Sequence, residues 1–126
     1  MPVIRKILVV DDSAVERYHL NEMLTKKGFK IVEASNGEDA VLKAKAHIPD
    51  LVLMDVVMPG QNGFQVTRQF SKDGELAHIP VIMCTSKDAE TDRVWGMRQG
   101  AKGYLIKPIQ SDSLFAMIQT LSTDTL

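Results

Sequence analysis

The chain has 126 residues, of which 44% are hydrophobic and 25% are charged, and these fractions are typical of one soluble globular domain. Its net charge of −1 gives no reason to expect nucleic acid or an anionic membrane as the main partner. The single cysteine, Cys84, has no mate for a disulfide, and the apolar run at 7–10 is too short for a signal peptide or membrane span, so we expect a cytoplasmic protein without membrane insertion.

Apolar runs alternate with helical patterns along the chain, and several helices carry signals for their ends. Short runs rich in apolar residues predict strands over residues 4–10, 31–34, 51–54, 81–85 and 104–106. Apolar residues at helical spacing predict helices over residues 14–27, 37–46, 64–70, 88–99 and 111–121. Ser13 and Asn36 are candidate N-caps, whereas Gly28 and Gly100 suit the left-handed position after a helix.

The spacing of apolar residues also predicts which helical side chains face the core. For the second helix the expected inward residues are Ala40, Val41, Ala44 and Ile48. For the fourth helix they are Val94 and Met97, with Trp95 at the border of the buried face. Trp95 can therefore either pack against a neighbouring helix or contact a partner protein.

Strands that alternate with helices through short loops require parallel pairing with right-handed crossovers, which defines an α/β fold. The first, third and fourth strands are the most apolar and are expected at the centre of the sheet. This favours a doubly wound, flavodoxin-like sheet of five strands in the order 2-1-3-4-5. We expect a single domain over residues 1–126, without an output domain.

Acidic residues follow two strands that this order places side by side. Asp11 and Asp12 follow the first strand and Asp55 follows the third, and neighbouring strands lie about 4.8 Å apart. Carboxylates this close cannot all remain ionised without a compensating positive charge. Their oxygen atoms suit a hard cation, for which we expect Mg²⁺, with Mn²⁺ as the alternative. Asp12 and Asp55 are the expected direct ligands, Asp11 a ligand through water, and the backbone carbonyl of Val57 a further ligand.

Two other polar side chains are expected at the same edge of the sheet. Thr85 ends the fourth strand, and Lys107 follows the fifth. A hydroxyl group and an ammonium group beside Asp55 suit a bound phosphate. An aspartate carboxylate can attack phosphorus and form an aspartyl phosphate, while a metal ion and Lys107 neutralise the charge. Asp55 is therefore predicted to accept a phosphoryl group.

These motifs resemble the response-regulator receiver domains of two-component signalling, similar to the chemotaxis regulator CheY. The resemblance runs from residue 6 to about residue 121 and is carried by Asp11-Asp12, Met-Asp-Val-Val-Met-Pro-Gly at 54–60, Thr85-Ser86 and Lys107-Pro108. Within the family, Asn-Gly-Phe-Gln at 62–65 and Val-Trp-Gly-Met-Arg-Gln-Gly-Ala at 94–101 look most like stand-alone regulators of the PilH type, from type IV pilus chemosensory systems.

The resemblance implies that Asp55 takes a phosphoryl group from a phosphohistidine on a sensor histidine kinase or its phosphotransfer domain, with Mg²⁺ bound. Thr85 then turns toward the phosphoryl oxygens, Lys107 pairs with them, and Tyr104 moves inward behind Thr85. A downstream protein reads the resulting change on the face formed by the fourth helix, the fifth strand and the fifth helix. Trp95 and Tyr104 are candidate contacts on that face. For Tyr104 the alternative is a half-buried aromatic residue with its hydroxyl at the surface.

The family also implies features of the bond before Pro108 and of the phosphate lifetime. The Lys107-Pro108 bond is expected to be cis. The positions that tune the rate of phosphate loss correspond to Val57 and Lys87. Fast members of the family carry an amide at the first position, and Val57 cannot orient an attacking water, so we expect phospho-Asp55 to be comparatively long-lived. The expected protein is a monomeric signalling protein of a motility or chemotaxis pathway and not an enzyme.

Other functions compete with this interpretation. A Mg²⁺-dependent phosphohydrolase with an aspartate nucleophile usually carries a second acid two residues later, where this chain has Val57. A flavodoxin-like FMN protein needs phosphate-binding donors after its first strand, where Asp11 and Asp12 would repel a phosphate. A third alternative is a receiver domain that binds partners without being phosphorylated. Such a domain does not need the complete set of acidic residues, threonine and lysine that this chain carries. The sequence does not choose between a signalling output and a phosphate sink for the kinase.

Overall fold

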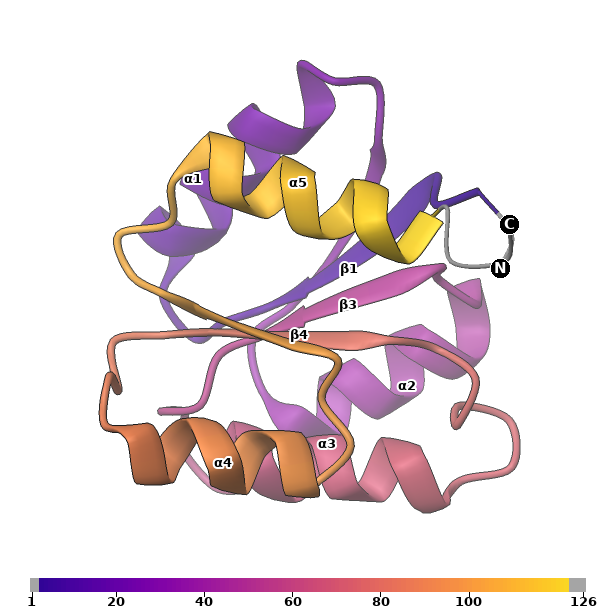
Figure 1. Cartoon of the computed structure of the whole chain (residues 1–126). Helices are drawn as coiled ribbons and strands as arrows, with labels where there is room; N and C mark the ends of the chain where they lie inside the picture. Colours follow the sequence, from indigo (N-terminus) through magenta and orange to yellow (C-terminus); the bar gives the residue numbers. More distant parts are fainter. Residues whose placement is uncertain (1–2, 123–126) are drawn as a thin grey trace.

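The computed structural model describes residues 3–122, which form one five-stranded parallel sheet with helices on both faces (Figure 1). The strands are β1 (Lys6–Val10), β2 (Lys30–Ala34), β3 (Leu51–Met54), β4 (Val81–Thr85) and β5 (Gly103–Ile106). The helices are α1 (Ala14–Thr25), α2 (Gly37–His47), α3 (Gly63–Lys72), α4 (Glu90–Arg98) and α5 (Ser111–Ser122). The sheet order is β2-β1-β3-β4-β5, which confirms the predicted flavodoxin-like α/β fold.

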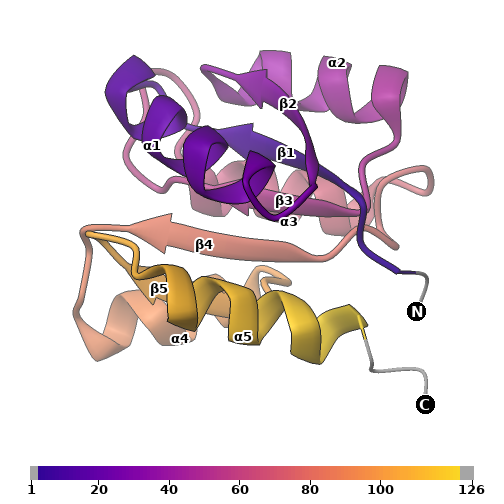
Figure 2. The same ribbon diagram turned by 90° about the horizontal axis from the view of Figure 1, so that it is seen from above.

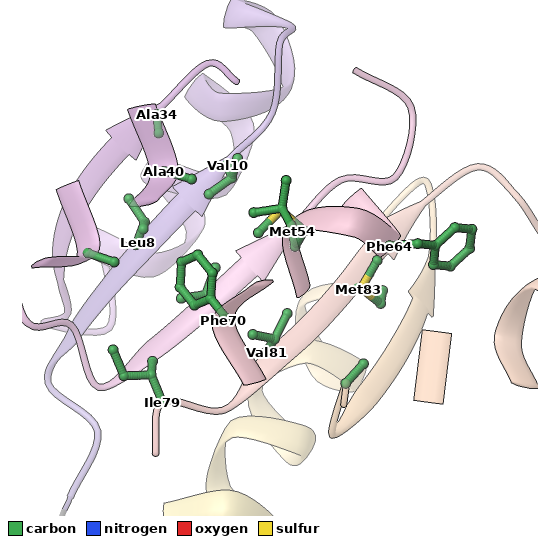
Figure 3. Close-up of a cluster of buried hydrophobic side chains, with 14 of the residues drawn as sticks. Leu8, Val10, Ala34, Ala40, Met54, Phe64, Phe70, Ile79, Val81 and Met83 are labelled. Carbon is green, nitrogen blue, oxygen red and sulfur yellow. The ribbon is translucent and has the colours of Figure 1, made fainter. Parts of the chain in front are cut away.

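The two faces of the sheet are covered by different helices. Alternate strand residues point to opposite faces, so Ile7 and Val9 pack with α1 and α5, whereas Leu8 and Val10 lie in the cluster that includes α2 and α3. Figure 1 shows the sheet between these two layers, and Figure 2 looks onto the sheet, whose strands lie side by side. In Figure 3, Phe70 of α3 lies among side chains that project from the strands. The core is therefore two clusters, one on each side of the sheet.

The predicted helix ends are largely confirmed. Ser13 accepts a hydrogen bond from the Glu16 N–H at 3.3 Å, and Asn36 accepts one from the Asp39 N–H at 2.8 Å. Gly28 and Gly100 both have positive φ angles, of 91° and 114°. The inward position predicted for Ile48 is wrong. Ile48 is itself the left-handed residue that ends α2, so the helical spacing no longer applies to it, and its side chain is exposed.

The predicted orientation of α4 is also wrong. The helix begins at Glu90 instead of Asp88, and Val94 and Met97 are 44% and 41% exposed instead of facing the core. The residue that faces the sheet is Gly96, where an added Cβ would lie 3.3 Å from ring carbons of Phe64 and Tyr104. Because a glycine contributes no apolar side chain to the pattern, the helical spacing did not reveal the buried side of α4.

Candidate functional site

The acidic residues converge at the carboxyl end of the central strands. Val10 of β1 pairs with Met54 of β3, so the residues that follow these two strands lie side by side. Carboxylate oxygens of Asp11, Asp12 and Asp55 lie within 4.8 Å of one another. The side chains of Asp11 and Asp55 are buried, whereas Asp12 is exposed. The cluster is therefore open to solvent on the side of Asp12.

Lys107 reaches this cluster from the end of β5. Its Nζ donates a hydrogen bond to Oδ2 of Asp11 at 2.7 Å and lies 3.5 Å from Oδ1 of Asp55. Burial lowers the pKa of Lys107, but the hydrogen bond to Asp11 and the negative charges of Asp55 and Asp11 outweigh burial, so the net pKa is raised. The ammonium group therefore stays charged and fixed beside Asp55.

The environment of Asp55 disfavours its negative charge. Burial and then the nearby charge of Asp11 raise its pKa to about 6, although Lys107 and the backbone N–H of Val56 act in the opposite direction. That N–H donates to Oδ1 of Asp55 at 2.9 Å. One lysine does not compensate fully for the clustered acids. The cluster is thus a place where a further positive charge is stabilised.

The carboxylate cluster fits a hard divalent cation. Its donors are all carboxylate oxygens, which Mg²⁺ prefers over nitrogen and sulfur ligands, and the open side leaves room for water or phosphate oxygens. In the part of the chain that the structure describes, this is the only group of three or more His, Cys, Asp or Glu residues close enough to hold a metal ion. The observed donor set therefore agrees with the cation class expected from the sequence.

Gly63 fixes the loop that carries Asp55, a role that the sequence analysis missed. The N–H of Gly63 donates to the carbonyl of Val56 at 2.8 Å, and an added Cβ would collide with the backbone carbonyl of Asp55. Asn62 and Gln65 form a capping box at the start of α3. The first residue of α3 thus packs directly on the Asp55 peptide. In the sequence, Asn62 and Gly63 were used for the family resemblance, whereas in the structure Asn62 caps α3 and Gly63 begins it.

Thr85 and Tyr104 lie on the other side of Asp55 and are joined through Lys87. Thr85 is fully buried, and its Oγ1 accepts a hydrogen bond from the Lys87 N–H at 3.2 Å. The Tyr104 hydroxyl donates to the Lys87 carbonyl at 2.8 Å, and burial of Tyr104 raises its pKa to about 12. The half-buried alternative for Tyr104 is wrong, because the ring is buried and its hydroxyl is bonded to the backbone.

The remaining predicted residues lie around this edge or on α4. Val57 and Lys87 are exposed on the loops after β3 and β4. Trp95 is 50% exposed on α4, so it does not pack into the core. The Lys107-Pro108 bond is cis, as expected from the family resemblance. Between residues 3 and 122, no helix combines the length and apolar character needed to span a membrane.

The chain belongs to the response regulator receiver domain family of two-component signalling, whose model matches residues 7–119. Protein PilH of Pseudomonas aeruginosa is 53% identical over 116 residues, which cover 92% of this chain and 96% of that protein. Response regulator PleD of Caulobacter vibrioides is 38% identical, but the match covers only 26% of that protein. The structure of chemotaxis protein CheY4 of Vibrio cholerae is 28% identical with a TM-score of 0.86, covering 92% of this chain and 97% of that one. These comparisons confirm the predicted family and the predicted similarity to PilH.

Proposed function

We propose that the protein accepts a phosphoryl group on Asp55 from a histidine kinase or its phosphotransfer domain, in a Mg²⁺-dependent reaction. The observation that carries this proposal is the buried Asp55 carboxylate, which lies among two other carboxylates with the Lys107 ammonium 3.5 Å away. The 53% identity to Protein PilH supports a place in pilus motility or chemotaxis-type signalling. The proposed role is that of a regulator whose only chemistry is its own phosphorylation and dephosphorylation.

In this proposal Asp12 and Asp55 bind Mg²⁺ directly, Asp11 binds it through water, and the Val57 carbonyl is a further ligand. When bound, the ion supplies positive charge that stabilises the transferring phosphoryl oxygens. Asp11 already uses Oδ1 to accept the Ser13 N–H and Oδ2 to accept Lys107. These two bonds support the indirect role proposed for Asp11. Mn²⁺ has the same preference for oxygen and is the alternative ion.

The proposed transfer begins with attack of an Asp55 carboxylate oxygen on the phosphorus of a phosphohistidine. A P–O bond forms as the P–N bond breaks, and the imidazole nitrogen leaves with the bonding electron pair and takes a proton from solvent. Lys107 pairs with the phosphoryl oxygens from its present position, and the Thr85 hydroxyl turns to donate to one of them. The charge that Asp55 gains is thus met by groups from two other strands.

A movement of Thr85 would reach α4 through the loop after β4. The Lys87 N–H is bonded to Thr85, and the Lys87 carbonyl is bonded to Tyr104. Tyr104 in turn lies against Gly96 of α4. We therefore propose that partners read the surface of α4, β5 and α5, with the exposed Trp95 as the contact candidate, whereas the buried Tyr104 would carry the change to this surface and not contact the partner itself. The exposed apolar side chains of Val94, Trp95, Met97 and Ile106 support this placement.

Several finer expectations remain predictions. Val57 has no amide to orient a water, so phospho-Asp55 is expected to lose its phosphate slowly, with Val57 and Lys87 as the residues that set the rate. The monomeric state and the cytoplasmic location also remain predictions. A half-life in isolation as short as that of fast CheY-like proteins would contradict the first of them.

The proposal is tested with acetyl phosphate and intact mass measurement. The wild-type protein is expected to gain the mass of one phosphoryl group when Mg²⁺ is present and none when it is chelated, and Asp55→Asn should gain none. Asp50→Asn is the matched control, because Asp50 lies before β3 and accepts backbone N–H groups of Arg5 and Lys6, away from the cluster. Phosphorylation of Asp55→Asn, or phosphorylation of the wild type that does not depend on Mg²⁺, would contradict the proposal.

A further inference from the structure

The peptide group between Asp11 and Asp12 is held from one side by an arginine of α1. Its carbonyl oxygen, that of Asp11, accepts a hydrogen bond from Nη1 of Arg17 at 2.7 Å. The Nε of the same guanidinium lies 3.0 Å from Oε1 of Glu33 on β2. The planar group of Arg17 therefore joins the turn after β1 to the neighbouring strand.

Other bonds fix Asp11 but leave the direction of Asp12 to this peptide group. The Asp11 N–H donates to the carbonyl of Ala34 at 3.1 Å, and the Asp11 carboxylate is held by the Ser13 N–H and by Lys107. Within residues 3–122, Asp12 makes no side-chain hydrogen bond or ion pair. The position of the Asp12 carboxylate is therefore set mainly by its backbone, which the Arg17 bond orients.

Glu33 keeps Arg17 in this position. Nδ2 of Asn21 donates to Oε2 of Glu33 at 3.2 Å, so α1 contacts this carboxylate twice. Nζ of Lys43 in α2 donates to the backbone carbonyl of Glu33 at 2.6 Å and pairs with Asp39 at 3.3 Å, and within residues 3–122 it makes no ion pair with the Glu33 carboxylate that holds Arg17. The guanidinium is thus directed toward Glu33 and the Asp11 carbonyl. Within residues 3–122, Arg17 forms its ion pair with Glu33 and not with the three clustered acids.

We propose that Arg17 is a positioning residue for the divalent-cation site, because it orients the Asp11-Asp12 peptide so that the Asp12 carboxylate stays beside that of Asp55. The inference rests on the Mg²⁺ site proposed above. It makes a distinctive prediction, because the charge of Arg17 repels a cation. Loss of that charge alone would tighten Mg²⁺ binding, whereas loss of the orienting bond weakens it.

The test is the Mg²⁺ dissociation constant, measured by isothermal titration calorimetry on protein shown to be folded by circular dichroism. Arg17→Gln is expected to weaken binding about tenfold, as is typical when a residue that orients a metal ligand is lost. Arg17→Lys should fall between Arg17→Gln and wild type, since a lysine keeps the charge but cannot make both contacts in one plane. Lys43→Gln is the matched control. It removes a charge from the same network without touching the Asp11-Asp12 peptide, and its binding should be unchanged or slightly tighter.

The outcomes separate this inference from the proposed function. If the wild-type protein binds no Mg²⁺, the proposed Mg²⁺ site is contradicted. The site is also contradicted if Asp55→Asn binds Mg²⁺ as tightly as the wild type. A wild type that binds Mg²⁺ through Asp55, with unchanged or tighter binding in Arg17→Gln, overturns only the role of Arg17. An equal loss in Lys43→Gln also overturns it. If Arg17→Gln does not fold, the Mg²⁺ affinity of Arg17→Lys tests the proposal instead. Wild-type affinity in Arg17→Lys would show that the two guanidinium contacts, to Glu33 and to the Asp11 carbonyl, are not needed.

Discussion

The helices α3 and α4 lie on the same face of the sheet, yet they are attached to it very differently (Figure 1). In α3 half of the ten residues are buried, namely Gly63, Phe64, Val66, Thr67 and Phe70. In α4 only Gly96 is buried among nine residues. The start of α3 carries a capping box, whereas the N-cap of α4, Ala89, makes no side-chain hydrogen bond. The helix next to Asp55 is thus firmly fixed, and the helix beyond Tyr104 is not.

The different attachment of α3 and α4 suggests different roles for the two helices. Gly63 of α3 packs on the Asp55 peptide, so the phosphate-accepting group proposed here is on the rigid side. The buried contact of α4 is Gly96 against the rings of Phe64 and Tyr104, so this helix can shift at small cost in packing energy. A change at the site is then expected to appear as a movement of α4 rather than of α3.

The largest expected effect compares a core residue of α3 with an exposed residue of α4. Phe70→Ala should lower the free energy of unfolding by about 3–5 kcal/mol, because its ring is 1% exposed and its loss leaves a cavity. Trp95→Ala should change it by less than about 1 kcal/mol, because half of that side chain is already in water. Urea unfolding followed by circular dichroism measures both values. Similar losses in the two variants would show that α4 is as firmly attached as α3.

A second pair of variants adds one methyl group to each helix. Gly63→Ala should cost about 3 kcal/mol, because the new Cβ meets backbone atoms of Asp55 and Val56 that cannot move aside. Gly96→Ala should stay within about 1 kcal/mol of wild type. Its Cβ meets only ring carbons at 3.3 Å, and alanine favours a helix by about 1 kcal/mol over glycine. A large loss in Gly96→Ala would mean that α4 cannot shift.

The third prediction concerns the pH dependence of stability on the rigid side. The pKa of Asp55 is about 6 in the folded protein against an ordinary value of 3.8, so folding favours the protonated form. The protonated Asp55 carboxyl therefore favours the folded state. This stabilisation is fully present at a pH below 3.8 and is lost as the pH rises through about 6. Without divalent ions, Asp55→Asn should therefore be more stable than wild type at neutral pH by about 2 kcal/mol, and the two should converge near pH 4.

Urea unfolding in a chelating buffer across this pH range checks the prediction. Added Mg²⁺ should stabilise the wild type and narrow its gap to Asp55→Asn, because the ion binds the ionised cluster. Asp50→Asn serves as the control, since Asp50 lies away from the cluster and its removal should not produce a pH-dependent gain. A difference between wild type and Asp55→Asn that does not vary with pH would show that the Asp55 carboxylate is not destabilised by its surroundings.

The fold and the members of the acidic cluster could be predicted from the sequence for a simple physical reason. The carboxyl ends of parallel strands meet at one edge, so residues that follow apolar runs, such as Asp11, Asp55 and Lys107, are brought together by topology alone. Each of these positions is local to its own strand. Their roles in phosphoryl transfer remain predictions that the proposed labelling experiment addresses.

The parts that could not be predicted depend on contacts between distant segments. The buried side of α4 is set by Gly96, which has no side chain to enter an apolar pattern. Gly63 is required because α3 begins on the Asp55 peptide, and Arg17 matters because it reaches the carbonyl of Asp11. The outward position of Ile48 follows from the left-handed end of α2. None of these features alters the spacing of apolar residues along the chain. That spacing therefore could not reveal them.

The smallest expected effect tests the missing cap of α4. Ala89 has φ −69° and ψ 141°, an extended conformation in which a serine can accept a backbone N–H of the first helical turn. Ala89→Ser should therefore stabilise the protein by about 0.5–1 kcal/mol, whereas Asn62→Ala should cost about 1 kcal/mol by removing the capping box of α3. Urea unfolding measures both changes.

Because the new cap strengthens only the end of α4 and adds no contact to the sheet, the rate at which acetyl phosphate labels Ala89→Ser should stay at the wild-type value. A slower rate would show instead that fraying at the start of α4 reaches Asp55.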